Sequence, residues 1–350
     1  MQLGGHSYRA VILLGAGATR GAFTGIGRAK IRAPLNRDFF VVARNLAKTA
    51  AGRRYRAAVK RLDKFVANEM RFHRGAPPTM EEVFNVLFMS KDLPRIFFRR
   101  GKPRNAGHRQ EIDDFISVVV GVLRYVQENP RHRSGIDHYE RLAANLQSGD
   151  ALVCLNYDTT MDNALAVRGW NARTGYGFEL DAKKVRVIDN FPREPALRDV
   201  LLLKPHGSLN WFSKGSIRSF EKVLDGRRPP NVEMTYIPKA NVKKGYVRLF
   251  IPPLYVKFFA NPFWRRLWDK AFERLREAQV LVIVGCSLVQ TDFHLRSIVG
   301  AAVASRRVKF KRIVIVEPSA DVRSRLKTFL RGRGEKIVIY PDFTAFVRSL

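Results

Sequence analysis

Short runs of apolar residues recur along this chain, and stretches with helical spacing separate them. The runs are four to six positions long and rich in Val, Ile and Leu. They lie at residues 9–14, 151–155, 200–203, 280–284, 312–316 and 336–340, with a weaker one at 185–188. Strands that are apolar throughout and alternate with helices are typical of a parallel sheet covered on both faces. The pattern therefore predicts an α/β fold with a Rossmann-like parallel sheet.

Residues 38–149 have a different pattern. Apolar and basic residues alternate at helical spacing over 39–72, and a new helix with acidic residues in its first turn is predicted from Met80. Residues 96–109 are predicted to form a loop, and two amphipathic helices are predicted at 111–127 and 138–146. We therefore expect a helical insertion at 38–149 in an α/β domain made of residues 1–37 and 150–350.

The composition is that of an ordinary globular protein. Hydrophobic residues are 46% of the 350 positions, and no apolar run approaches the roughly 18 residues that a membrane span requires. The first apolar run is too short for the core of a signal peptide. The two cysteines, Cys154 and Cys286, are too few for a disulfide framework or a four-thiolate zinc site. We expect a cytoplasmic protein without zinc and without a membrane partner.

The net charge is +32, from 63 basic and 31 acidic residues. The excess is +15 over residues 1–148 and +18 over 201–350, whereas residues 149–200 carry −1. The charge therefore belongs to the folded body and not to a removable tail. A field of this size attracts polyanions and speeds their association. It indicates a nucleic acid or a nucleic-acid-associated partner, while an acidic protein partner or a species-wide preference for arginine would also explain it.

A glycine-rich turn, Gly15-Ala16-Gly17-Ala18-Thr19, follows the first apolar run, with a further glycine at position 21. Glycines let a backbone approach a pyrophosphate closely, and the start of the next helix offers N–H groups and a positive dipole end. The spacing G-x-G-x-x-x-G is one residue longer than the common dinucleotide-binding pattern. The turn alone is therefore a weak signal for a phosphate contact, and a plain tight turn is the alternative.

Five polar residues follow the carboxyl ends of predicted strands: Asn156, Asp158, His206, Ser287 and Glu317. Ligands of open α/β sheets bind at this edge, so these side chains are expected to converge there. Each also has a simpler explanation. Asn156 fits a turn, Asp158 or Ser287 fits a helix cap, His206 fits an ordinary loop, and Glu317 fits a solvated strand end. Their joint placement carries more weight than any one of them.

Taken together, the motifs resemble those of the sirtuin-like superfamily of NAD-binding proteins. The matching pieces are Gly15-Ala16-Gly17-Ala18-Thr19, Asn156-Tyr157-Asp158, Lys204-Pro205-His206-Gly207-Ser208-Leu209-Asn210-Trp211, and Gly285-Cys286-Ser287-Leu288 with Asp292, in the family's order. The matched segments run from residue 10 to about 320. Sirtuin deacylases carry a small zinc module held by four cysteines, which this chain lacks. It looks more like the bacterial sirtuin-like effectors that hydrolyse NAD, many of them in anti-phage defence.

The resemblance implies that NAD lies across the carboxyl edge of the sheet. The cofactor-binding residues would be Gly15, Ala16, Gly17 and Thr19 in the first turn, near the pyrophosphate, and Gly285 and Ser287 in the turn that contacts phosphate and ribose. Glu317 stands where sirtuins often carry an asparagine near the adenosine ribose. A carboxylate also accepts hydrogen bonds from ribose hydroxyls, although this departure leaves its assignment open.

The catalytic residues that the resemblance implies are Asn156, Asp158 and His206. The pKa of an unperturbed histidine, about 6.5, suits a base near neutral pH, so His206 would activate a ribose hydroxyl or the water. Asn156 would hold that water or a hydroxyl, and Asp158 would fix the nicotinamide amide. We expect an NAD glycohydrolase that cleaves the nicotinamide–ribose bond. The alternatives are a sirtuin-like ADP-ribosyl or acyl transferase, and a basic nucleic-acid-associated binding module whose NAD pocket does not turn over.

An unregulated NAD hydrolase would drain its own cell, so a resting state is expected. By analogy with defence systems, control would come from assembly into a homo-oligomer or from docking on a partner ATPase or a nucleic-acid-bound complex.

Overall fold

The structure is a computed structural model, and it divides the chain into two compact units. It describes residues 2–3, 6–7, 9–23, 31–70, 77–92, 108–129, 133–178, 199–214, 232–234, 245–251, 261–288 and 292–350. One unit comprises residues 1–24, 130–250 and 257–350, and the other comprises 25–129 and 251–256. We call them the α/β unit and the helical unit. The expected strand at 185–188 and residues 96–107 of the expected loop lie outside the described residues.

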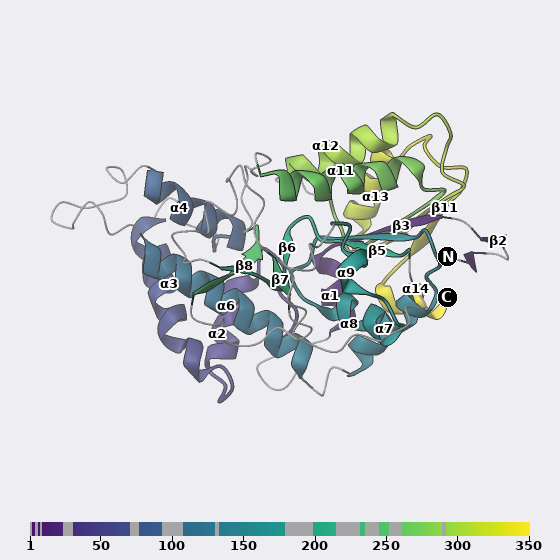
Figure 1. Ribbon diagram of the computed structural model, residues 1–350. Helices are drawn as coiled ribbons and strands as arrows, with labels where there is room; N and C mark the ends of the chain where they lie inside the picture. The colour runs from purple at the N-terminus through teal and green to yellow at the C-terminus, as the bar shows by residue number, and fades with distance from the viewer. Residues whose placement is uncertain are drawn as a thin grey trace. The chain divides into compact units, whose positions relative to one another are not determined.

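The α/β unit is built on a six-stranded parallel sheet (Figure 1). Its strands are β3 (Ala10–Leu14), β4 (Ala151–Cys154), β5 (Leu201–Leu203), β9 (Val280–Val284), β10 (Arg312–Val316) and β11 (Ile337–Tyr340). They lie in the order β11-β10-β9-β3-β4-β5, and every neighbouring pair is parallel. Counted along the chain from β3, this is the order 3-2-1-4-5-6 of Rossmann folds, which reverses direction between strands 1 and 4. The predicted α/β fold class is confirmed.

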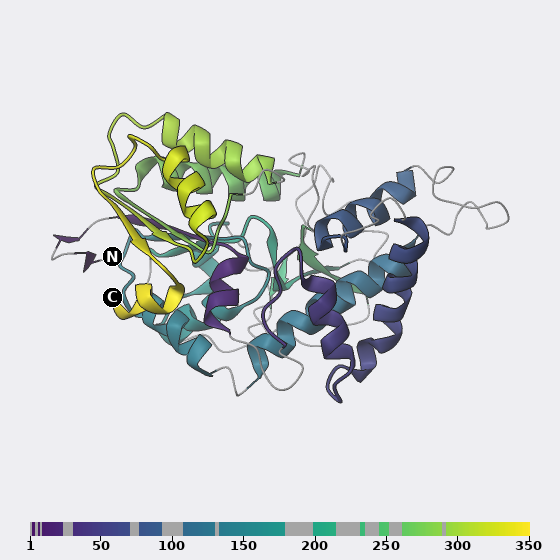
Figure 2. The ribbon, with the colours of Figure 1, turned by 180° about the vertical axis from the view of Figure 1, so that it is seen from behind.

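Helices cover both faces of this sheet, as Figures 1 and 2 show from opposite sides. One face carries α11 (Pro262–Glu277), α12 (Phe293–Ala304) and α13 (Ala320–Phe329), and the other carries α1 (Ala16–Ala22), α7 (Arg133–Ala144), α8 (Thr160–Val167) and α14 (Phe343–Arg348). Every residue of β3, β4 and β9 is buried between these layers. This explains why the strands are apolar at every position and show no alternation. The α/β unit also contains the short helix α9 (Ala172–Gly175) and the antiparallel strand pair of β1 (Gln2–Leu3) and β2 (His6–Ser7).

A second, antiparallel sheet was not predicted from the sequence. Strand β6 (Gly207–Lys214) pairs with β7 (Glu233–Met234) on one side and with β8 (Tyr246–Phe250) on the other. Seven of the eight residues of β6 are buried, polar ones included. Residues 208–211 alternate between polar and apolar, but Trp211 and Phe212 are adjacent apolar residues and the register shifts between Gly207 and Phe212, so the alternation that would indicate an antiparallel strand breaks after four positions.

The helical unit contains α2 (Phe39–Ala47), the short η1 (Arg53–Tyr55), α3 (Arg56–Glu69), α4 (Met80–Asp92) and α6 (Arg109–Glu128). Aromatic rings of Phe39, Phe84 and Phe115 pack together, with centroids 5.0–5.9 Å from the ring of Phe115. Helix α4 starts with a capping box. The Glu82 N–H donates to Thr79 Oγ1 at 3.2 Å, and the Thr79 N–H donates to Glu82 Oε2 at 2.7 Å.

The division into units differs from the expected boundaries at three places: residues 25–37 and 251–256 fall in the helical unit, and residues 130–149 fall in the α/β unit. The expected insertion covered residues 38–149, but α7 at 133–144 belongs to the α/β unit, where it packs against α1, α8 and α14. Tyr139 of α7 is buried there beside Phe23 and Phe343. Among the described residues, no helix is long and apolar enough to span a membrane.

Candidate active site

The sheet register brings the carboxyl ends of four strands to one level. Leu14 is paired with Cys154 on one side and with Val284 on the other, and Val284 is paired with Val316. The chain therefore leaves β3, β4, β9 and β10 at the same edge. That edge contains the point where the strand order reverses, which is where ligands of open α/β sheets bind. The motifs singled out in the sequence all begin at this edge.

The two glycine turns, after β3 and after β9, pack directly against each other. The Gly15 N–H donates to the Val284 carbonyl oxygen at 3.0 Å, and the Gly17 N–H donates to that of Gly285 at 2.9 Å. A Cβ atom on Gly15 would lie 2.4 Å from the Gly285 oxygen, and one on Gly17 would lie 2.7 Å from the Gly285 Cα. These glycines are therefore required by turn-to-turn contact. Their N–H groups are already bound to carbonyls, and Ala16 is the exposed residue of the first turn.

Asn156 joins the loop after β4 to the first glycine turn. Its Nδ2 donates to the Gly15 carbonyl oxygen at 3.0 Å and to Thr19 Oγ1 at 2.9 Å, and its side chain is 7% exposed. Thr19 in turn donates to Asp158 Oδ2 at 3.0 Å. One amide group thus holds the turn and the loop together. Its Oδ1 makes no hydrogen bond within the described part of the chain, so this oxygen is the atom of Asn156 that remains for a ligand.

Asp158 is tied into this network through both carboxylate oxygens. Oδ2 accepts from Thr19, and Oδ1 accepts from the Thr160 N–H at 3.0 Å at the start of α8. The hydroxyl of Tyr139 contacts Thr19 and stays protonated. Burial, followed by the nearby Asp158 charge, raises the pKa of Tyr139 well above its usual value. Thr19 has one hydrogen, which goes to Asp158, so Tyr139 donates to Thr19 over their 2.9 Å contact. These contacts make Asp158 an organiser of the loop.

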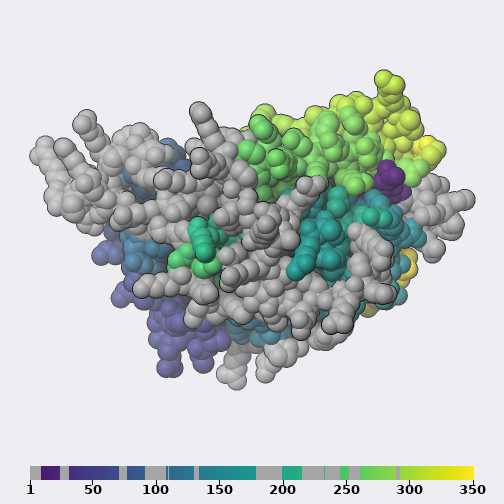
Figure 3. Space-filling model, viewed as in Figure 1, coloured from purple at the N-terminus to yellow at the C-terminus, as the bar shows by residue number. Residues whose placement is uncertain are grey.

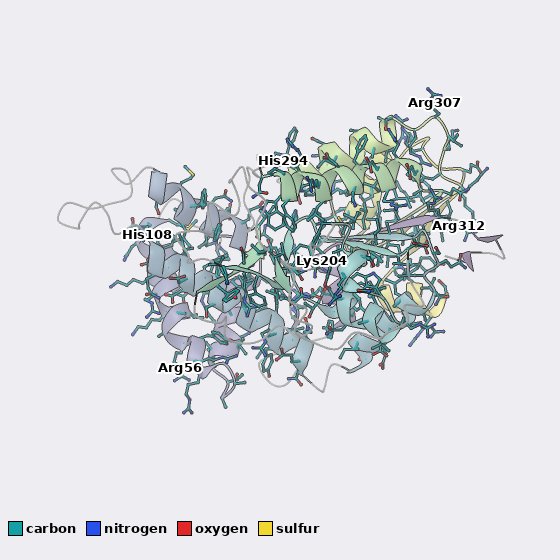
Figure 4. All side chains as sticks on the ribbon, in the orientation of Figure 1. Arg56, His108, Lys204, His294, Arg307 and Arg312 are labelled. Atoms are coloured by element: carbon teal, nitrogen blue, oxygen red, sulfur yellow. The ribbon has the colours of Figure 1, made fainter. Side chains whose placement is uncertain are left out.

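A fully buried lysine links the loop after β4 to the one after β5. Lys204 has no exposed area, and its Nζ donates to the Asp158 carbonyl oxygen at 2.5 Å and to Asp162 Oδ2 at 2.9 Å (Figure 4). The other oxygen of Asp162 accepts from the hydroxyl of Tyr176, which also accepts from Asn210 Nδ2 at 3.1 Å. Burial, followed by the Asp162 charge, raises the pKa of Tyr176 well above its usual value. The ion pair therefore holds the loop after β4 and the loop after β5 together.

His206 lies in the tight turn between β5 and β6. The Gly207 N–H donates to the Lys204 carbonyl oxygen at 2.8 Å, which closes the turn, and Gly207 has a φ of +83°. The His206 ring is 9% exposed and lies edge-on to Trp268 of α11, with ring centroids 5.7 Å apart. Just beyond the turn, the Leu209 N–H donates to the Tyr157 carbonyl oxygen at 2.9 Å. His206 is thus held on the same assembly as the Asn156 loop.

Ser287 and Glu317 lie at the same edge of the sheet with different surroundings. Ser287 is half-buried and does not cap α12, because the side chain of Asp292 accepts from the Leu295 N–H at 3.3 Å at that position. Leu288, directly after Ser287, has a φ of 44° and is the only described non-glycine residue with a positive φ. Glu317 Oε1 accepts from the Ser319 N–H at 3.0 Å, and the side chain is 9% exposed. Glu317 therefore also organises its own turn.

Both cysteines are free, and the thiol of Cys154 is unreactive. Cys154 and Cys286 are both buried and free, and burial is the main cause that raises the pKa of Cys154 to about 12. A thiol with such a pKa stays protonated and unreactive near neutral pH. No group of three His, Cys, Asp or Glu side chains that could hold a metal ion occurs in the described ranges.

The sequence did not single out Lys204, Asp162, Tyr176 or Tyr139, although Lys204 stands in a quoted motif. The available signals were weak. Asp162 lies four positions after Asp158, one turn further along α8, and Lys204 directly follows an apolar strand. Charged residues are rarely fully buried, so neither position would have been expected inside the fold.

Replacement of Lys204 by methionine is expected to lower the free energy of unfolding by about 3–5 kcal/mol, because it leaves the buried Asp162 carboxylate without its cation. Lys311→Met is the matched control. Lys311 pairs with Glu335 at 2.8 Å, but the two side chains are 47% and 49% exposed, and exposed pairs contribute only about 0–1 kcal/mol. Urea unfolding of both variants measures the difference. Equal, small losses would show that the buried pair does not hold the loops.

Comparison with known proteins adds no assignment. The chain matches no protein-family model, and a search of the curated proteins finds no similar sequence.

Proposed function

We propose that this protein is an NAD glycohydrolase, which cleaves the nicotinamide–ribose bond to give nicotinamide and ADP-ribose. The observation that carries the proposal is the network of hydrogen bonds that joins the separate strand-end motifs at the crossover of the sheet. Asn156 bonds to the Gly15 turn, the Gly17 turn bonds to Gly285, and the Lys204 turn bonds to the Asp158 loop. The resemblance of the same motifs to sirtuin-like proteins supports the choice of NAD.

NAD would lie along the carboxyl edge of the sheet as the substrate. The exposed Ala16 and the half-buried Gly17 and Ser287 form the surface of the two turns there, and they would face the pyrophosphate and a ribose. Glu317 has a second carboxylate oxygen, Oε2, that could accept from a ribose hydroxyl. The close packing of Gly15 and Gly285 gives these groups a rigid base, which suits a site that must hold a dinucleotide in one geometry.

The chemistry requires little more than a fixed ribose and one placed water, because neutral nicotinamide is already a good leaving group. His206 is the base that activates a ribose hydroxyl or the water, and a positioned base contributes typically ~10²–10⁴-fold to rate. Asn156 holds the water or a hydroxyl through its remaining Oδ1. Asp158 was expected to fix the nicotinamide amide. Since both of its oxygens already accept hydrogen bonds within the protein, we assign it to holding the loop that carries Asn156.

The direct test is incubation of the purified protein with NAD, alone and with added DNA or cell lysate, while nicotinamide and ADP-ribose are measured. We expect equal amounts of the two products in at least one of these conditions, since control by an oligomer or a partner remains part of the proposal. Nicotinamide release with ADP-ribose attached to protein would indicate a transferase. Saturable NAD binding without any product in all conditions would indicate a binding module and would contradict the proposal.

A further inference from the structure

A dense group of basic residues lies where the chain leaves α12 and where it enters β11. Residues 306–312 and 331–336 contain eight basic residues and one acidic residue. The backbone brings the two segments side by side. Phe310 and Gly334 form a parallel bridge, the Phe310 N–H donates to the Arg333 carbonyl oxygen at 2.8 Å, and the Ile313 N–H donates to that of Lys336 at 2.8 Å. The charges are therefore neighbours in space as well as in sequence.

Three of the eight basic residues have a role within the fold or limited exposure. Arg306 Nη1 donates to two backbone carbonyls at the end of α11, its guanidinium lies 3.7 Å from the centre of the Phe310 ring, and burial lowers its pKa. Lys311 forms the exposed ion pair with Glu335. Arg312 is half-buried at the start of β10. These contacts account for their places in the structure.

The other five basic residues make no such contact within the described part of the fold: Arg307, Lys309, Arg331, Arg333 and Lys336. We call them the basic edge. All five are exposed, and none forms an ion pair with any described residue. Figure 4 shows the side chain of Arg307 pointing away from the fold, and Figure 3 shows the segment after α12 as a yellow-green projection from the surface. Unpaired like charges held this close repel one another, so the basic edge is a site where an anionic occupant would be stabilised.

We propose that the basic edge binds the phosphodiester backbone of a nucleic acid. Lys and Arg are the usual donors to phosphate, and a nucleic acid supplies regularly spaced charges to several of them at once. A protein partner is the weaker fit. Protein interfaces take much of their affinity from buried aromatic and other large anchors, whereas the large exposed hydrophobic residue in these two segments is a single valine, Val308, 66% exposed.

The basic edge lies at the opposite end of the sheet from the candidate active site. It surrounds the amino ends of β10 and β11, whereas the candidate site is at the carboxyl ends of the parallel strands. A strand of this length spans about 16 Å at ~3.3 Å per residue. A nucleic acid on the basic edge therefore leaves the carboxyl edge open, and it should not compete with NAD. This inference rests on charge and geometry and stands apart from the proposed hydrolysis.

The test is the binding of a short fluorescent DNA duplex of mixed sequence, and of an RNA of equal length, to the full chain between about 50 and 200 mM salt. The variant changes all five residues of the basic edge to glutamine. We expect it to lower affinity at least about tenfold and to reduce the slope of log affinity against log salt by up to about 4.5, since each lost phosphate contact removes about 0.9 from that slope. Added NAD should leave wild-type binding unchanged.

The matched control removes the same number of charges from α3 and the turn before it, by changing Arg53, Arg54, Arg56, Lys60 and Lys64 to glutamine. These five are also exposed, so the control separates location from total charge. Equal losses in the two variants would overturn the proposal, as would wild-type protein that binds neither DNA nor RNA at low salt. Binding to anionic lipid vesicles or to a polyglutamate peptide, but not to nucleic acid, would overturn it as well. Circular dichroism confirms that both variants fold.

Discussion

Replacement of His206 by alanine is expected to reduce NAD cleavage by about 10²–10⁴-fold while the fold stays intact. The imidazole is suited to act as a base near neutral pH, whereas both carboxylate oxygens of Asp158 already accept hydrogen bonds that hold its loop. His206 lies in a turn and not in a strand or helix, and its ring packs edge-on against Trp268, so we expect its removal to leave the sheet in place. Nicotinamide release under activating conditions gives the rate, and circular dichroism reports folding.

His138→Ala is the control for removing a histidine from the same unit. His138 lies on α7, where its Nε2 contacts Thr344 Oγ1 at 2.9 Å, and its loss should leave turnover unchanged. Asn156→Ala is expected to cost about 10²–10³-fold in rate. If both residues act on the same water, as proposed, the double variant with His206→Ala should lose less than the product of the two. Wild-type turnover in a folded His206→Ala protein would remove His206 from the mechanism.

The second large effect is expected from Gly285→Ala, which should lower the free energy of unfolding by more than about 4 kcal/mol. A Cβ atom at this position would lie 2.1 Å from the Ala18 nitrogen and 2.2 Å from the Gly17 carbonyl carbon, all within backbone that cannot rotate away. The φ of +55° adds the cost of a left-handed alanine, about 1–2 kcal/mol. The two turns would have to separate and lose their mutual hydrogen bonds.

Gly332→Ala isolates the contribution of the backbone angle. Gly332 has a φ of +74°, but a Cβ atom there would meet nothing within 4 Å. Its loss of stability should therefore stay near the cost of the left-handed conformation alone, about 1–2 kcal/mol. Urea unfolding of both variants measures the difference, which is the energy of the turn-to-turn contact. If Gly285→Ala were as stable as Gly332→Ala, the two turns would have to be freely deformable.

The parallel sheet could be predicted because burial on both faces leaves a direct trace, the apolar run. Residues 280–284, for example, are buried throughout and apolar throughout. Strand β6 leaves no such trace. Its polar residues Ser208, Asn210 and Ser213 are buried together with the apolar ones, and its alternation of polar and apolar residues breaks after four positions, at Trp211 and Phe212. The unit to which α7 belongs could not be predicted either. The sequence of this helix indicates that Tyr139 is buried but not which segments it packs against.

The candidate site was predictable as a set of strand ends but not as a set of contacts. The glycines at 15, 17 and 285 indicate close approach, yet only the structure shows that each turn approaches the other. The sequence also cannot reveal that Lys204 is buried, because its ion pair with Asp162 depends on the docking of β5 beside β4. The roles of His206 and Asn156 in NAD cleavage remain predictions.

The pairing of β3 with β9 also has a consequence for the order in which the protein matures. The two strands lie at residues 10–14 and 280–284, so the ribosome must synthesise the whole stretch between them before Gly15 can meet Gly285. Contacts of such long sequence separation form late and slowly. A nascent or truncated chain that ends before β9 lacks half of the crossover. The candidate site can therefore assemble only after β9 has been synthesised.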